Sequence, residues 1–187
     1  MIEQQNDSPS TGITFRRAGN GDEAAVRAID GSFTTNTIFE VSGDEDGFRL
    51  REIPVSPPIN KVFPADAEED DEDDDPVRFV CVDSAGVVCG FIDLEHEPWN
   101  GRMTISDVEI SPEQRGRGIG RELVNLAIGH ARELRARTLW LEVTNINAPA
   151  INAYRRLGFT LCGLDTSLYR GTASEGETAL FMSRDLT

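Results

Sequence analysis

The feature that most constrains the fold is a strand-like segment that passes through a glycine-rich turn into an amphipathic helix, between Met103 and Glu133. The letters MTISDVEI alternate as a strand does, and apolar residues then recur at helical spacing from Gly118 to Leu134. The turn holds glycines at 116, 118 and 120, where the backbone can approach a ligand closely. Since the first N–H groups of a helix lack intrahelical acceptors, the pattern predicts an anion-binding turn that suits a diphosphate.

Three arginines, Arg115, Arg117 and Arg121, add positive charge to this turn. The spacing excludes two common phosphate motifs, because a P-loop requires GxxxxGK[ST] and a dinucleotide fingerprint requires glycine where Arg121 stands. What remains is R-x-x-G-x-G. This short motif also fits a strand-to-helix turn without a ligand, so it needs support from elsewhere in the chain.

The rest of the chain alternates strand and helix patterns. A strand over residues 13–18 leads to a helix that begins near Asp22 or Asn20. Two apolar strands, VRFVCVD and VVCGFIDLE, flank a Ser-Ala-Gly turn and predict a β-hairpin. The chain then ends with the strand TLWLEVT, the helix APAINAYRRLG, and the strands FTLCGL and TALFMS. We expect one mixed α/β domain over residues 1–187.

The weakest pattern lies at about residues 34–76, which we interpret as an insertion or lid. Short strands, TIFEV and FRLREIPV, flank the turn-rich GDEDG there, and a proline-containing stretch follows. Nine acidic residues then lie in the run 66–75. Such a block is usually a solvated, self-repelling loop, but it could also supply a field that attracts a polycationic partner.

The composition argues against several classes of protein. A net charge of −15 is the wrong sign for binding nucleic acid through phosphate neutralisation. The three cysteines lack CxxC spacing and, with two histidines, form no typical zinc cluster, so we expect packing cysteines, no disulfide and no metal. The chain shows neither a membrane-length apolar stretch nor a signal peptide, which predicts a cytoplasmic protein without a membrane partner. The oligomeric state stays open, with a homodimer as one option.

A second sequence pattern supports a ligand-binding role for the glycine-rich turn. Asn147, Ala150, Tyr154, Gly158 and Phe159 read N-x-x-A-x-x-x-Y-x-x-x-G-F. Together with R-x-x-G-x-G and the intervening strand, this pair of motifs resembles the GNAT N-acetyltransferase superfamily over about half of the chain. The resemblance implies a GNAT fold: a central mixed, mostly antiparallel sheet with a splayed parallel strand pair, flanked by helices.

Further segments resemble the streptothricin (nourseothricin) acetyltransferases of the antibiotic-resistance type. These segments are GSFTT near Gly31, LREIPV, the acidic run, LWLEVTNINAPAINAYRRLGF, TLCGLDTSLY and GTAS. The resemblance implies acetyl transfer from acetyl-CoA to a primary amine of a cationic small molecule, with the β-lysine amine of streptothricin as the leading acceptor. Three alternatives stay open: an acetyltransferase of a protein N-terminus, lysine or polyamine; a non-catalytic acetyl-CoA-binding module; and an acidic run that docks a basic protein.

The resemblance also implies where acetyl-CoA binds, namely where the parallel strands 103–110 and 138–144 separate. The N–H groups of residues 115–120 would hold the pyrophosphate, and the backbone of residues 108–110 would pair with the pantetheine arm and polarise the thioester carbonyl. Asn147 would contact the pantetheine or another cofactor amide. The implied cofactor-binding residues are Val108, Ile110, Arg115, Gly116, Arg117, Gly118, Ile119, Gly120, Arg121, Asn147, Ala150 and Tyr154.

Tyr154 matches the family tyrosine that protonates the departing CoA thiolate; the structural alternative is a core tyrosine bonded to backbone. The attacking amine must also lose a proton, because a lysine-like amine is mostly protonated at neutral pH. Asp107, Glu109 and Glu142 lie on the two strands and are the candidate bases, with Glu109 and Asp107 ranked before Glu142. Each could instead line an electronegative cleft for a cationic substrate.

Other large side chains near the motifs receive structural interpretations. We expect Trp99, Trp140 and Tyr169 to pack in the core. Arg155 and Arg156 could reach the ribose 3′-phosphate of the cofactor, although a solvated helix face explains them more simply.

Overall fold

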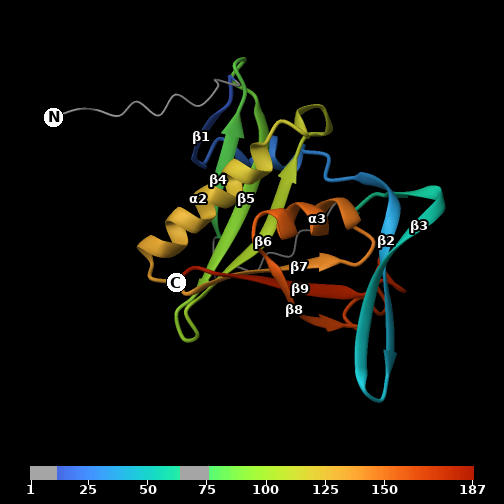
Figure 1. The fold of residues 1–187 in the computed structure, drawn as a ribbon. Coiled ribbons are helices and arrows are strands. Elements are labelled where there is room, and N and C mark those ends of the chain that lie inside the picture. Colours follow the sequence, from blue (N-terminus) through green and yellow to red (C-terminus); the bar gives the residue numbers. More distant parts are fainter. Residues whose placement is uncertain (1–11, 64–75) are drawn as a thin grey trace.

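The computed structural model describes residues 12–63 and 76–187 (Figure 1). The large sheet consists of β1 (Thr14–Arg17), β4 (Val77–Val82), β5 (Val88–Glu97), β6 (Arg102–Ile110), β7 (Thr138–Thr144), β9 (Ala179–Asp185) and β8 (Thr160–Asp165), in this spatial order. Only the β6–β7 pair is parallel among its neighbouring strands in the described residues. This confirms the expected mixed, mostly antiparallel sheet.

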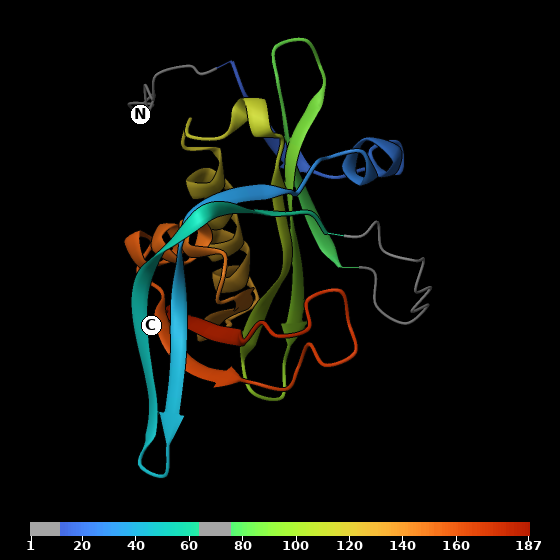
Figure 2. The same ribbon diagram turned by 90° about the vertical axis from the view of Figure 1, so that its right-hand side faces the viewer.

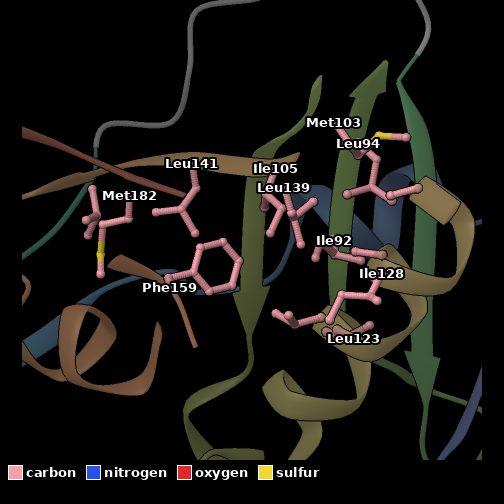
Figure 3. Packing of buried hydrophobic residues seen from close by; sticks show 14 of the residues in the cluster. Ile92, Leu94, Met103, Ile105, Leu123, Ile128, Leu139, Leu141, Phe159 and Met182 are labelled. Atoms are coloured by element: carbon pink, nitrogen blue, oxygen red, sulfur yellow. The ribbon is translucent and has the colours of Figure 1, made fainter. Parts of the chain in front are cut away.

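Four helical segments accompany the strands: α1 (Glu23–Arg27), the short 3₁₀ helix η1 (Pro112–Gln114), α2 (Ile119–Glu133) and α3 (Ala148–Arg156). The sequence predicted α2 and α3 within a residue or two, because each carries one apolar face toward the sheet. The buried side of α2 includes Leu123, Val124 and Ile128. These side chains belong to the same hydrophobic cluster as Ile92 and Leu139 of the sheet. This cluster is the main core of the protein (Figure 3). Both predicted helices thus cover the sheet that carries the glycine-rich turn.

The segment predicted as an insertion with short strands is a long β-hairpin instead. β2 (Phe33–Asp44) and β3 (Gly47–Lys61) pair from the hairpin turn to Phe33 and Lys61, except at one irregularity between Thr35 and Thr37, where residues 55–58 of β3 have no partner in β2. The prediction was wrong in ending the second strand before Pro57, because both strands of a two-stranded sheet are edge strands and tolerate proline. The hairpin projects beyond the large sheet (Figure 2). The acidic run 66–75 lies outside the described residues.

The middle of the hairpin is attached to the main body through Phe39. This side chain is buried, and its backbone N–H donates to the carbonyl of Asn145 at 2.9 Å. The Asn145 side-chain amide donates in return to the Phe39 carbonyl at 2.8 Å, and the Arg155 guanidinium stacks over the Phe39 ring. The hairpin therefore packs directly against the residue that follows β7 and against the last turn of α3.

The cysteines take two kinds of position. Cys81 and Cys89 are buried with their sulfurs 3.6 Å apart, and burial raises the pKa of the Cys81 thiol to about 12. These two are inert packing residues, as expected. Cys162 is exposed, so its assignment to the core was wrong.

The parallel pair β6–β7 separates halfway along its length. Pairing runs from Arg102 opposite Thr138 to Ile105 opposite Leu141 and stops there. Beyond this point β6 pairs with β5 alone and β7 with β9 alone. The β5–β6 register shifts by one residue at Ser106, and such a bulge bends its strand. The bulge thus explains why β6 turns away from β7 at this position.

Candidate active site

A cleft of about 1000 Å³ lies at the splay between β6 and β7. Its walls come from the α1–β2 loop, β6, the glycine-rich turn, β7, α3 and the β8–β9 loop. Every residue that the sequence analysis assigned to the site lines this cleft, except Arg117. The fold therefore brings the two motifs together in one cavity.

Glycine is required in the turn before α2 for two different reasons. Gly116 and Gly118 have φ of 77° and 85°, in the left-handed region that other residues avoid. A Cβ at Gly120 would lie 3.2 Å from Cδ1 of Ile110, so glycine permits close packing of α2 on β6. Gly118 caps α2 without a side-chain bond, and residues 118–120 line the cleft, so the first N–H groups of the helix lie beside it. This geometry suits an anion such as a diphosphate.

The arginines of the turn take three different positions. The guanidinium of Arg115 donates to the carbonyls of Asp30, Ser32 and Ile110 at 2.6–2.8 Å, which ties the α1–β2 loop to the turn. Arg117 does not line the cleft, but it donates a hydrogen bond to Gln114, which does. Arg121 lines the cleft beside Gly118, and its exposed guanidinium pairs with Glu122 at 3.2 Å. In the part of the chain that the structure describes, it makes no hydrogen bond to a backbone carbonyl.

Tyr154 projects from α3 and packs its ring on Phe159. Burial raises the pKa of its hydroxyl, and the negative charges of Asp107 and Glu142 raise it further. Both carboxylates therefore lie close enough to act on this hydroxyl from opposite sides of the splay. Within the described residues we find no backbone hydrogen bond to the hydroxyl, which the structural alternative would require.

Glu142 holds a partner that the sequence analysis missed. The hydroxyl of Tyr169, in the β8–β9 loop, donates a hydrogen bond to Oε1 of Glu142. Tyr169 was expected in the core, and this was wrong: the side chain lines the cleft. Burial and the charges of Glu142 and Glu177 raise the pKa of the Tyr169 hydroxyl, so it remains a donor at neutral pH. No periodic pattern surrounds this tyrosine, so hydrophobic spacing could not have placed it.

Glu109 lines the cleft next to Gly31, which the sequence analysis did not assign to the site. Val108 and Ile110 pack toward the core, so alternation along β6 turns Glu109 to the other face of the strand. A Cβ at Gly31 would lie only 1.9 Å from Oε1 of Glu109. Gly31 therefore leaves the space that this carboxylate occupies.

A nearly buried ion pair supports the floor of the same region. Lys61, at the end of β3, pairs with Glu177 in the β8–β9 loop, and both side chains are about one-tenth exposed. Glu177 also accepts from the hydroxyl of Thr144 at 2.5 Å, and Lys61 donates to Ser174 at 2.8 Å. The network joins the hairpin, β7 and the β8–β9 loop.

Asn147 caps α3 through a hydrogen bond from the Ala150 N–H to its side-chain oxygen at 3.2 Å, and it lines the cleft.

Trp140 packs on Phe181 and under Arg102. Trp99 is 83% exposed in the β5–β6 turn, so its expected core position was wrong.

Two negative findings apply to residues 12–63 and 76–187. They contain no cluster of histidine, cysteine, aspartate and glutamate that could hold a metal ion. Their helices are all too short or too polar to cross a membrane.

Comparison with known proteins agrees with this geometry. Residues 48–159 match the acetyltransferase (GNAT) family. A streptothricin acetyltransferase of Streptomyces lavendulae is 54% identical over 175 residues, covering 90% of this chain and 93% of its own. The crystal structure of a nourseothricin acetyltransferase superposes with a TM-score of 0.87 at 52% identity, covering 95% of this chain and all of that one. A Bacillus anthracis protein solved in complex with acetyl coenzyme A has a TM-score of 0.76 at 24% identity, covering 92% and 98%. The chain belongs to the GNAT family of acetyltransferases.

Proposed function

We propose that this protein transfers the acetyl group of acetyl-CoA to a primary amine of streptothricin, with the β-lysine amine as the acceptor. The observation that carries the proposal is the cleft itself, which unites the glycine-rich turn, Tyr154 and three carboxylates at one splay. The similarity to acetyltransferases named for streptothricin and nourseothricin supports the choice of acceptor. An amine-rich cation also suits a cleft lined by Asp107, Glu109 and Glu142. We further propose that residues 1–187 act as one catalytic domain in the cytoplasm.

For the cofactor, we propose that the backbone of the turn from Gly116 to Gly120 holds the pyrophosphate at the start of α2, with Arg121 adding charge. The unpaired edge of β6 at Val108 and Ile110 would bind the pantetheine arm, since its backbone groups have no strand partner on the β7 side. Asn147 can offer its amide nitrogen to the same arm, because its oxygen caps α3.

In the proposed reaction the amine nitrogen attacks the thioester carbonyl carbon. A C–N bond forms, the C–S bond breaks, and the electron pair of that bond leaves on sulfur. The amine proton passes to one of the cleft carboxylates, and the thiolate receives a proton through Tyr154. Because burial and the charges of Asp107 and Glu142 raise the pKa of Tyr154, its hydroxyl is protonated when the thioester binds. It donates a hydrogen bond to the developing thiolate, gives up that proton as the C–S bond breaks, and the phenolate is reprotonated from solvent.

The first experiment measures CoA-thiol release from acetyl-CoA by the purified protein, with and without streptothricin. Streptothricin-dependent release, with a product heavier by one acetyl group, would support both the reaction and the acceptor. Saturable acetyl-CoA binding without release would contradict the acceptor and direct the assay to peptides and polyamines. Tyr154→Phe should lower kcat about 10²-fold with unchanged acetyl-CoA affinity by calorimetry; unchanged turnover would remove Tyr154 from the reaction.

A further inference from the structure

We propose that Tyr169 is a positioning residue that holds the carboxylate of Glu142 toward the acceptor subsite, where Glu142 accepts the proton of the attacking amine. The inference rests on the proposed function and deepens it, because it selects one carboxylate among three candidates. Sequence reasoning ranked Glu109 and Asp107 first, and the contacts of Glu142 favour the opposite order.

The position of Glu142 follows from the strand register. Leu141 is the last residue of β7 that is opposite β6, so Glu142 is the first residue beyond the separation. Its backbone remains fixed by pairing with Phe181 of β9. The side chain therefore starts from a rigid strand at the mouth of the splay, on the cleft wall.

Tyr169 lies in the β8–β9 loop, which is attached to the rest of the protein by contacts that do not involve Glu142. The Lys61–Glu177 ion pair fixes one end of this loop, and the backbone N–H of Thr178 donates to the side chain of Asn145 at 2.8 Å. Closer to the tyrosine, the hydroxyl of Thr172 donates to the Tyr169 carbonyl at 2.8 Å. A donor anchored in this way restricts the rotamers of the carboxylate that it contacts.

The charges around Glu142 explain why such a partner is useful. Burial raises the pKa of Glu142, the negative charge of Glu177 raises it further, and the hydrogen bond from Tyr169 lowers it. The charges of Glu142 and of Asp107 on β6 both act on the hydroxyl of Tyr154 on α3, whose pKa they raise. A raised pKa makes Glu142 a stronger proton acceptor, whereas the Tyr169 bond keeps it ionised near neutral pH.

Kinetics test the role in the reaction. Tyr169→Phe keeps the ring but loses the donor, so we expect kcat with streptothricin to fall about tenfold. The acidic limb of the kcat–pH profile should move to higher pH, because the hydrogen bond that lowers the Glu142 pKa is lost. The KM for acetyl-CoA should not change. In a Glu142→Gln background, Tyr169→Phe should have no further effect on kcat.

Ser167→Ala is the matched control, since it removes a side-chain hydrogen bond to Asp165 in the same loop and touches nothing at Glu142. We expect wild-type kinetics for this variant. If Tyr169→Phe lowers kcat without moving the acidic limb, or lowers it equally in the Glu142→Gln background, Tyr169 has only a structural role and the proposal fails.

A second test needs no acceptor, because the chain has only two tyrosines. In a Tyr154→Phe variant, ultraviolet titration reports Tyr169 alone. Adding Glu142→Gln should lower the Tyr169 pKa toward its usual value of about 10, with circular dichroism to confirm folding across the titration. An unchanged titration would refute the contact. A second outcome separates the two proposals. If the Tyr169 pKa shifts but the wild-type protein does not acetylate streptothricin, the contact between Tyr169 and Glu142 stands, whereas the proposed acceptor and the role of Glu142 as base are both refuted.

Discussion

Replacing Gly31 by alanine would show how closely the placement of Glu109 is tied to the reaction. The added Cβ would lie 1.9 Å from Oε1 and 2.6 Å from Cδ of Glu109, far inside van der Waals contact, so the carboxylate must move by about 1 Å or more. Gly31 does not have a positive φ, so alanine can keep the backbone conformation. Because the clash falls on the end of a flexible side chain, we expect the free energy of unfolding to change by less than about 1 kcal/mol.

The effect on turnover should be larger than the effect on stability. A misplacement of about 1 Å at a reacting or binding group can cost up to about 10²-fold in rate. We expect kcat/KM for streptothricin to fall about 10- to 100-fold, which is about 1.4–2.8 kcal/mol. Acetyl-CoA affinity should stay the same, since the three atoms nearest to the added Cβ all belong to Glu109 and none belongs to the glycine-rich turn.

A double-mutant cycle on CoA release separates this explanation from a general disturbance of the loop. Glu109→Ala removes the side chain with which the Cβ collides, so Gly31→Ala should have no further effect in that background. Gly21→Ala is the matched control, because nothing lies within 4 Å of its Cβ. An equal loss in both backgrounds, or full activity of Gly31→Ala alone, would refute the reasoning.

Three further predictions concern other parts of the molecule. Lys61→Met leaves Glu177 with an unpaired, nearly buried charge, so urea titration should show a loss of about 3 kcal/mol, and Lys61→Met with Glu177→Gln should lose less than the two single changes summed. Gly118→Glu places a charged side chain at a φ of 85° beside the proposed phosphate site, so calorimetry should show at least about tenfold weaker acetyl-CoA binding; unchanged affinity would remove that site. Tyr154 and Tyr169 have pKa values raised above the unfolded value of about 10, so their contribution to stability is complete below pH 10 and is lost as pH rises toward the folded values. Urea titrations between about pH 9 and pH 11 should show a shallower decline for Tyr169→Phe, and an identical slope would contradict the raised pKa.

The strands and helices of the large sheet could be predicted because each has a local cause. The apolar stripe on α2 reflects burial of one face, and the continuous apolar runs in β4 and β5 reflect burial of both faces of these strands. Positive φ at Gly118 and Gly158 marks where helices begin or end. The hairpin β2–β3 was harder, since it is mostly exposed and carries no strong apolar alternation. Its length is set by pairing between two edge strands, which local propensity does not reveal.

Site contacts from the motifs could be predicted, whereas contacts between distant loops could not. Tyr154 and the glycine turn lie in segments with recognisable spacing. Tyr169 reaches Glu142 across 27 residues, and Gly31 meets Glu109 from a loop far along the chain. Such contacts depend on how loops pack over the sheet, and one sequence gives no periodic signal for them. Arg115 shows the converse: its motif position suggests a ligand, but its guanidinium holds three carbonyls of the protein.

A single local event links the fold to the proposed chemistry. The extra residue at Ser106 ends the β6–β7 ladder after Ile105 and Leu141. The same separation leaves the β6 backbone unpaired on the cleft side and makes Glu142 the first side chain beyond the ladder. Asp107 then acts on the Tyr154 hydroxyl from one strand, and Glu142 acts on it from the other. A thioester bound along the unpaired β6 edge would therefore meet its proton donor and its proton acceptor across the gap that the bulge creates, so the bulge serves the reaction as well as the shape of the sheet.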